Sequence, residues 1–181
     1  MIEPKDAEIL KLYREGRESA ALNLLVNTYK TSLYWHIRKI VISHDDTDDI
    51  LQDTFVKAWK GISSFRDEAK LYTWLYRIAT NESLNLIQKR KRNRILPWGD
   101  KEPTLTATLS IEPVFCDADP QEVLRMAIET LPDKQRIVFN MRYFDEMPYI
   151  EMAQILQTSE GALKASYHHA VKKIEQFVSL Y

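Results

Sequence analysis

The sequence predicts an all-α fold with two small helical domains joined by a proline-containing linker, the second a four-helix domain with a helix-turn-helix. Apolar residues recur at helical spacing in every long segment, and no segment shows the two-residue alternation of a strand. Only four glycines and seven prolines occur in 181 residues, which disfavours a turn-rich β fold. With 45% hydrophobic residues, the chain has enough apolar material for a core.

The first domain is expected to span residues 1–95 and to contain three amphipathic helices. The first apolar stripe comprises Leu22, Leu25, Val26, Tyr29, Leu33, Ile37 and Ile40. The second comprises Leu51, Phe55, Ala58 and Ile62, after Thr47 as N-cap and with Asp48 and Asp49 in the first turn. The third comprises Leu71, Trp74, Leu75, Ile78, Ala79 and Leu86, and leads into the basic stretch 88–94.

Residues 96–119 form the expected linker, because they contain prolines, serines and threonines and show no helical period. The second domain, residues 120–181, begins with Asp119 as N-cap, Pro120 at the first helical position and Glu122 at the capping-box position. Pro132 ends this helix and Asp133 starts the next, in which Phe144 is expected to point inward.

A helix-turn-helix is predicted next. Pro148 starts a short helix over 148–156 with Ile150, Ala153 and either Ile155 or Leu156 inward, and Ser159 caps the following helix. The core stripe of that helix is Leu163, Tyr167, Ala170 and Ile174, and its opposite face carries Gly161, Lys164, Ala165, His168 and Lys172. Such a face is typical of a recognition helix in a major groove. An ordinary amphipathic pair with a solvated outer face fits the spacing equally well.

A basic and aromatic segment precedes the linker. Residues 89–94 hold five Lys or Arg, more than compensation of a helix dipole requires. Aromatic and amide side chains stand nearby, a combination that suits single-stranded nucleic acid. The expected contacts are Phe65, Arg66, Tyr72, Trp74, Arg77, Asn81, Asn85, Lys89 and Arg90. A core role for Trp74 and a loop-anchoring role for Phe65 stay open.

An acidic cluster lies over residues 45–53. The cluster has three interpretations: capping of a helix, a solvated helix face, and a docking site for a basic protein surface.

Other classes of protein receive little support from the sequence. Cys116 is the only cysteine, no signal peptide precedes the first helix, and no apolar run is long enough to span a membrane. A cytoplasmic protein without membrane insertion is therefore expected.

Phosphate-loop, zinc-protease and serine-hydrolase motifs are absent, and the histidines lack metal-ligand spacing. We expect no catalytic residue, metal or cofactor.

Taken in order, three segments resemble a bacterial RNA polymerase sigma factor of the sigma-70 family, extracytoplasmic-function subfamily. DDTDDILQDTFVKAWKGISSF is similar to the segment that binds the polymerase clamp helices. FRDEAKLYTWLYRIATNESLNLIQKRKR is similar to the segment that melts and reads the −10 element. LPDKQRIVFNMRYFDEMPYIEMAQILQTSEGALKASYHHAVKKI is similar to the domain that reads the −35 element.

The resemblance implies core RNA polymerase and promoter DNA as partners, and an anti-sigma factor as an inhibitor. The implied polymerase-facing residues are Asp45, Asp48, Asp49, Leu51, Gln52 and Phe55. The basic and aromatic set around Trp74 would contact −10 DNA, with Phe65 holding a flipped base. The polar face around Lys164 would meet the −35 groove. The family often has Asp at the place of Asn85 and Ser-Arg at the place of Ala165–Ser166.

A free-standing helix-turn-helix regulator of duplex DNA is the alternative. It would need a sensor or dimerisation domain, and residues 1–95 offer neither strand alternation nor a heptad seam.

Overall fold

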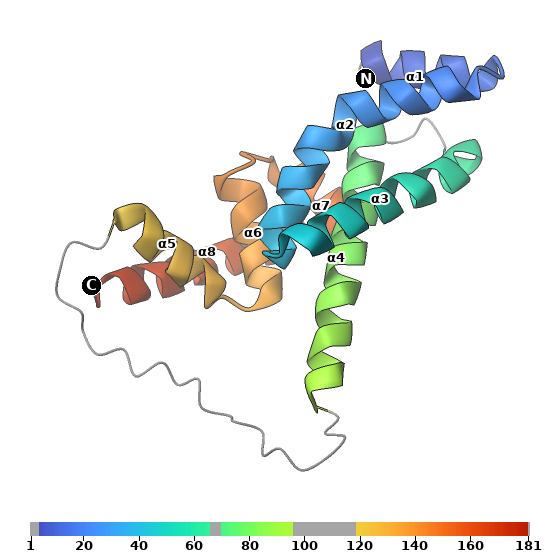
Figure 1. Cartoon of the computed structure of the whole chain (residues 1–181). Coiled ribbons are helices and arrows are strands. Elements are labelled where there is room, and N and C mark those ends of the chain that lie inside the picture. The colour runs from blue at the N-terminus through green and yellow to red at the C-terminus, as the bar shows by residue number, and fades with distance from the viewer. Residues whose placement is uncertain (1–3, 66–69, 96–118, 181) are drawn as a thin grey trace.

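The computed structural model describes residues 4–65, 70–95 and 119–180. Over these ranges the chain forms eight α-helices and a short 3₁₀ turn, with no strand (Figure 1), which confirms the all-α prediction. The N-terminal half contains α1 (Pro4–Arg14), α2 (Glu18–Val41), α3 (His44–Gly61), η1 (Ile62–Ser64) and α4 (Leu71–Ile95). The C-terminal half contains α5 (Pro120–Glu129), α6 (Asp133–Tyr143), α7 (Tyr149–Leu156) and α8 (Glu160–Val178). The linker prediction falls on residues 96–118, outside the described residues.

The core of the N-terminal half lies where α2, α3 and α4 meet. Its fully buried side chains come from the predicted stripes and include Leu25, Leu33, Ile37, Ala58, Leu75 and Ala79. Burying a leucine or isoleucine side chain stabilises a fold by roughly 1.5–3 kcal/mol, and the alanines contribute less. The helical period therefore identified the inward faces of α2, α3 and α4.

Helix α1 was not predicted, and it packs against α2. Ile9 and Leu10 join the core, and Asp6 is buried beside them at 1% exposure. The Asp6 carboxylate accepts hydrogen bonds from the hydroxyl of Tyr29 and from the backbone N–H of Leu71, the latter at 3.2 Å. Leu71 is the first residue of α4, so a side chain from α1 satisfies one of the free N–H groups at the start of that helix.

The predicted start of the second helix was wrong. Helix α3 begins at His44 with Ser43 as its N-cap, and the Ser43 hydroxyl accepts from Asp46 N at 3.4 Å. Thr47 lies inside the helix, where its hydroxyl donates to the Ser43 carbonyl at 2.7 Å. Asp45 and Asp46, rather than Asp48 and Asp49, occupy the first turn. The sequence SHDDTDD holds several residues able to cap a helix, and spacing alone does not choose among them.

The capping residues of the C-terminal half agree with the prediction. Asp119 accepts from Gln121 N at 3.0 Å, and Ser159 accepts from Ala162 N at 3.2 Å. The Glu122 carboxylate is the exception, because it pairs with Arg125 instead of closing a capping box. A core cluster under α5 and α8 contains Ala127, Ile128, Leu131, Phe139, Ala170 and Ile174.

Two residues predicted to point inward are exposed: Phe144 at 46% and Ile150 at 60%. Phe144 is the C-cap residue of α6. The chain then turns at Glu146, whose φ is 49°, and Met147 is buried instead of Phe144. Helix α7 starts at Tyr149, with Pro148 as its N-cap, and buries Met152 and Ile155, which leaves Ile150 on its outer side.

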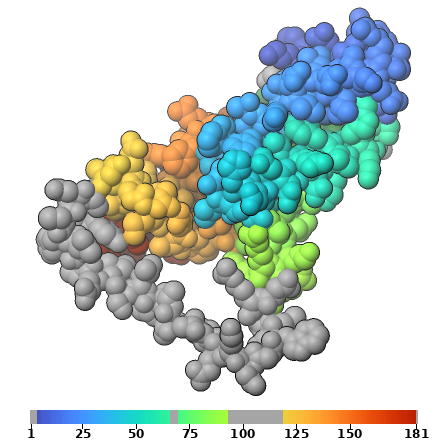
Figure 2. All heavy atoms as spheres, viewed as in Figure 1, coloured from blue at the N-terminus to red at the C-terminus, as the bar shows by residue number. Residues whose placement is uncertain are grey.

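The two halves pack on one another. Helix α7 lies against α4, and α6 lies against the C-terminal end of α2 (Figure 1). Figure 2 shows the yellow and orange C-terminal half adjoining the blue N-terminal half. One buried cluster runs across this boundary, from Leu71, Leu75 and Ala79 to Met141, Met152 and Ile155.

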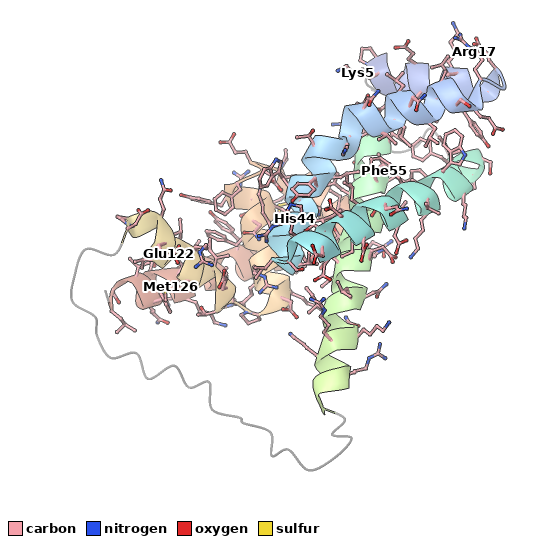
Figure 3. The ribbon with its side chains drawn as sticks, viewed as in Figure 1. Lys5, Arg17, His44, Phe55, Glu122 and Met126 are labelled. Carbon is pink, nitrogen blue, oxygen red and sulfur yellow. The ribbon has the colours of Figure 1, made fainter. Side chains whose placement is uncertain are left out.

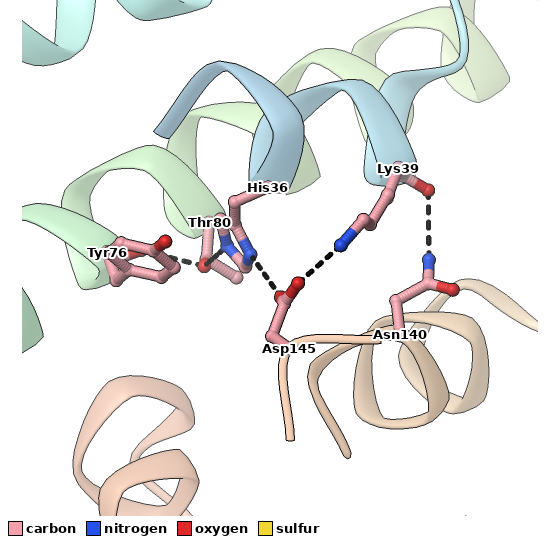
Figure 4. Close-up of polar contacts among 6 residues, drawn as sticks. All are labelled: His36, Lys39, Tyr76, Thr80, Asn140 and Asp145. Carbon is pink, nitrogen blue, oxygen red and sulfur yellow. Dashed lines mark hydrogen bonds and ion pairs between the residues drawn. The ribbon is translucent and has the colours of Figure 1, made fainter. Parts of the chain in front are cut away.

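Polar groups from both halves meet beside this cluster (Figure 4). Asp145, in the turn after α6, pairs with Lys39 of α2 and lies 3.7 Å from Nδ1 of His36. The His36 Nε2 atom lies 2.8 Å from the hydroxyl of Thr80 on α4. The same Thr80 hydroxyl donates to the Tyr76 carbonyl at 2.7 Å, so these contacts join α2, α4 and the turn after α6.

We expect Asp6→Ala to lower the free energy of unfolding by about 3 kcal/mol, because a buried hydroxyl and a backbone N–H lose their acceptor. Urea unfolding followed by circular dichroism measures this. Glu8→Gln, on the exposed side of the same helix, is the matched control and should unfold like the parent. Equal stability of the Asp6 and Glu8 variants would contradict the capping role.

We also expect Asp145 to make stability depend on acid pH. Burial raises the pKa of Asp145, but its interactions with His36 and Lys39 outweigh burial and hold the pKa below its ordinary value. The stabilisation is therefore complete above about pH 4, the ordinary aspartate pKa, and is lost as the pH falls through the lower folded pKa.

The test compares the free energy of unfolding of the parent and of Asp145→Asn across this range. The parent should be more stable at pH 6, and the difference should shrink below about pH 4. Glu146→Gln, one residue away and exposed, should show little difference at any pH. A stability difference between the parent and the Asp145→Asn variant that does not change with pH would contradict the assignment.

Candidate nucleic-acid and protein interfaces

Four of the residues predicted to contact −10 DNA share one face of α4. Trp74, Arg77, Asn81 and Asn85 stand at i, i+3, i+7 and i+11, a spacing that aligns side chains along a helix. Asn81 and Asn85 are exposed, whereas Trp74 and Arg77 are half-buried. Along this face, the half-buried Trp74 and Arg77 are therefore followed by two amide side chains, Asn81 and Asn85, that are open to solvent.

Phe65 and Trp74 form an aromatic pair beside the upper end of this face. Their ring centroids are 5.2 Å apart, and both side chains are half-buried against the core. Gly61 lies directly under the Trp74 ring, where a Cβ atom would approach the ring to 3.2 Å. The core reading and the binding reading of Trp74 are thus compatible, since the ring packs on one side and is accessible on the other.

Tyr72 faces a different direction. Its ring centroid lies 4.1 Å from that of Tyr76, on the side of α4 that the C-terminal half covers. Burial, followed by the charge and hydrogen bond of Tyr76, raises the pKa of Tyr72 above its ordinary value, and the carboxylates of Asp145 and Glu151 add to the effect. The Tyr72 hydroxyl is therefore uncharged. Its neighbours include residues of the C-terminal half, which carries the predicted helix-turn-helix.

The basic end of α4 is exposed but partly neutralised. Lys89 and Arg90 are exposed, and Arg90 pairs with Asp46 of α3 at 2.6 Å. Lys91 forms an ion pair with Asp133 at the start of α6. Arg66 lies outside the described residues.

The face predicted to meet the −35 groove is fully open on α8. Gly161, Lys164, Ala165, His168 and Lys172 are all exposed. Leu163, Ala170 and Ile174 are buried on the opposite side, as predicted, and Tyr167 is half-buried. A Cβ atom on Gly161 would meet nothing within 4 Å, so packing against α7 does not require a glycine there.

The residues predicted to face polymerase lie along α3, where Figure 3 labels His44 and Phe55. Asp45, Asp48, Asp49 and Gln52 are exposed, and Phe55 is half-buried. Leu51 is buried at 6% exposure, so it supports the helix from inside and presents no side chain outward.

An apolar groove of about 330 Å³ extends this face toward α2. Its lining residues are Leu22, Val26, Gln52, Phe55, Val56, Trp59 and Lys60. The sequence pattern assigned Leu22 and Val26 to the core, and it did not single out Val56 or Trp59. One feature of the sequence could have indicated this groove. Leu25 and Val26 are adjacent apolar residues, and an apolar stripe that wide can contact two different surfaces.

Within the residues that the structure describes, no three His, Cys, Asp or Glu side chains are grouped as metal ligands would be. Across the same residues, no helix has the length and apolar character needed to cross a membrane.

Two family models match the chain: sigma-70 region 2 over residues 25–93 and sigma-70 region 4 over residues 121–174. The ECF RNA polymerase sigma factor SigW of Bacillus subtilis is 30% identical over 170 residues, which cover 88% of this chain and 89% of SigW.

Solved structures show the same fold at 22% identity. CnrH, in complex with the cytosolic domain of CnrY, superposes with a TM-score of 0.70 over 97% of each chain. The sigma factor RpoE of Bartonella quintana, in complex with the anti-sigma factor NepR, superposes with a TM-score of 0.67 over 87% of this chain and 96% of RpoE.

Proposed function

The chain belongs to the extracytoplasmic-function (ECF) group of the sigma-70 family of RNA polymerase sigma factors, and from this premise we propose how its surfaces act. As a sigma factor it binds core RNA polymerase, directs the enzyme to promoters with −10 and −35 elements, and promotes DNA melting. The bond-forming chemistry belongs to polymerase. We place the chain in the cytoplasm, where polymerase and promoter DNA lie.

The observation that carries this function is the presence of two separate exposed polar faces in one chain. One lies on α4 around Asn81 and Asn85, and the other lies on α8 around Lys164 and His168. The first half has its own family match and its own apolar groove, which a free-standing regulator of duplex DNA does not need.

Core polymerase is proposed to dock on α3 and the adjoining groove. Gln52, Phe55 and Val56 offer a partly apolar surface, and the neighbouring aspartates favour a partner that carries positive charge. The aspartates at the start of α3 then act in binding as well as in complementing the helix dipole.

Melting is proposed to use the Phe65–Trp74 pair. A flipped base costs a few kcal/mol of lost stacking, which a protein offsets with a pocket and aromatic surfaces. Trp74 is held by Gly61 and the core beneath it, so its free edge is rigid, while Asn81 and Asn85 can donate to bases or phosphates further along the helix.

An anti-sigma partner is proposed as the inhibitor. The structural relative RpoE is a sigma factor solved in complex with the anti-sigma factor NepR, and CnrH was solved in complex with the cytosolic domain of CnrY. Such a partner would cover one or more of the surfaces described above.

Run-off transcription on a pooled promoter library, with core polymerase and the full chain, tests the function. Defined start sites absent from reactions with core polymerase alone are expected. Transcripts no different from those of core polymerase alone would overturn the assignment.

Phe65→Ala should leave polymerase binding unchanged but impair promoter opening, because the flipped base loses an aromatic partner. Permanganate reactivity of thymines in the −10 region measures opening, and co-purification measures binding. Ser63→Ala, in the exposed turn just before, is the control. Normal opening by the Phe65 variant would remove the ring from the mechanism.

Val56→Glu should weaken binding to core polymerase by about tenfold or more, because a charge would be buried in an apolar contact. Val56 is 43% exposed, so the variant is expected to fold. Fluorescence anisotropy of the labelled chain titrated with core polymerase gives the affinity. Gln176→Glu, an exposed site on α8, adds the same charge away from the groove and should bind normally.

The chain alone should bind duplex DNA weakly, because residues 120–181 contain eight acidic residues against seven Lys or Arg. Mobility-shift assays at physiological salt should show specific binding only when core polymerase is present. Tight, sequence-specific binding by the isolated chain would favour the free-standing regulator.

A further inference from the structure

Tyr149, the first residue of α7, has a cation from each neighbouring helix over its ring. The guanidinium carbon of Arg142 on α6 lies 5.3 Å from the ring centroid, and the ammonium nitrogen of Lys164 on α8 lies 5.6 Å from it. Both distances are short enough for the electrons of an aromatic face to attract a cation. Tyr149 therefore links α6 to the helix that would read the −35 groove, although the sequence pattern assigned it no role.

The ring of Tyr149 is held by its surroundings. It is half-buried and packs against the buried cluster that contains Met152. Arg142 is held as well, because its guanidinium donates to the Met147 carbonyl at 3.2 Å and to the Glu146 carbonyl at 3.5 Å. These carbonyls belong to the turn between α6 and α7. The core and the Arg142 guanidinium therefore set the position of the ring before DNA binds.

Lys164 is a side chain that benefits from such support. It is 61% exposed, and a long, flexible lysine loses conformational entropy when a contact fixes it in one place. The Glu160 carboxylate, one turn earlier on α8, lies 3.9 Å from its ammonium. A carboxylate restrains the ammonium but also offsets its charge. An aromatic ring restrains the ammonium and leaves the charge available to DNA.

Positive charge is scarce in this half of the chain, so the position of each cation matters. Residues 120–181 contain eight acidic residues against seven Lys or Arg. The face assigned to the −35 groove carries two lysines, Lys164 and Lys172. Among the described residues, an aromatic ring lies under Lys164 but none lies under Lys172. The two lysines of one face thus differ in a way that can be tested.

We propose that Tyr149 is a positioning residue for −35 recognition. Its ring, fixed by Arg142 and the core, holds the Lys164 ammonium at the surface that faces DNA without neutralising its charge. The inference rests on the proposed function, because it assumes that α8 enters the −35 groove. It adds a residue of α7 that acts through Lys164.

The affinity of the reconstituted holoenzyme for a promoter duplex, chosen from the run-off selection, tests this role. Lys164→Gln should weaken binding. Tyr149→Leu should weaken binding by about two- to fivefold, in line with the strength of an exposed contact between a cation and a ring. Tyr149→Phe keeps the ring and should recover most of the lost affinity. A Phe variant that binds as weakly as the Leu variant would overturn a role for the ring.

Double variants separate positioning from a merely structural role. In a Lys164→Gln background, Tyr149→Leu should have no further effect, because the ring has no cation to position. In a Lys172→Gln background, Tyr149→Leu should weaken binding as much as it does in the parent. An equal loss in all three backgrounds would overturn the proposal, as would normal binding by the Lys164→Gln variant.

Ile150→Ala is the matched control, because it truncates the adjacent residue of α7, which is 60% exposed. It should bind promoter DNA like the parent, and a loss equal to that of Tyr149→Leu would contradict a specific role for Tyr149. A parent holoenzyme that does not prefer the promoter to a duplex without its −35 element would instead contradict the proposed function. The two failures are therefore distinguishable.

Proton NMR of the free full-length chain tests the contact without DNA or polymerase. The ring current of Tyr149 should place the ε-methylene protons of Lys164 upfield of those of Lys172. Tyr149→Leu should remove this difference, and Tyr149→Phe should retain it. Equal positions for the two lysines in the parent would overturn the proposal.

Discussion

Burial of the apolar stripe of α4 between α2 and α3 is the constraint on which the other features depend. Leu75 and Ala79 are fully buried there, which fixes the rotation of α4 about its axis. With that rotation set, Trp74, Asn81 and Asn85 lie along one flank and Tyr72 and Tyr76 along another. The same packing presents the outer side of α3 to solvent. A single core therefore orients two candidate interaction surfaces, and a substitution inside it would disturb both.

The contact between the halves combines apolar burial with a set of polar groups. His36, Lys39 and Asp145 meet at a boundary where water can replace each partner if the halves separate. Met141, Met152 and Ile155 are as fully buried at this boundary as Leu33 and Ile37 are in the core, so separating the halves would expose apolar surface as well. Helix α2 takes part in both the core and the contact between the halves.

Much of this arrangement followed from the sequence. Helical periodicity identified the inward faces of α2, α3, α4 and α8, and the caps at Asp119 and Ser159 were predicted correctly because Pro120 and Glu160, residues that favour a first helical turn, follow them directly. The cap of α3 was wrong because several candidates stand in a row. Phe144 and Ile150 were wrong because hydrophobicity does not reveal which side of a short helix meets a neighbour. The groove near Val56 and the contact between halves depend on residues distant in sequence, and no local pattern encodes such pairings.

The carboxylate of Asp6 has a consequence for the order in which the chain folds. Asp6 is synthesised 65 residues before Leu71, from whose backbone N–H it accepts a hydrogen bond. Contacts between residues so far apart carry a large loop-closure entropy and form late relative to local helices. Helix α4 therefore acquires its proper beginning only when α1, an earlier segment of the chain, has docked against it.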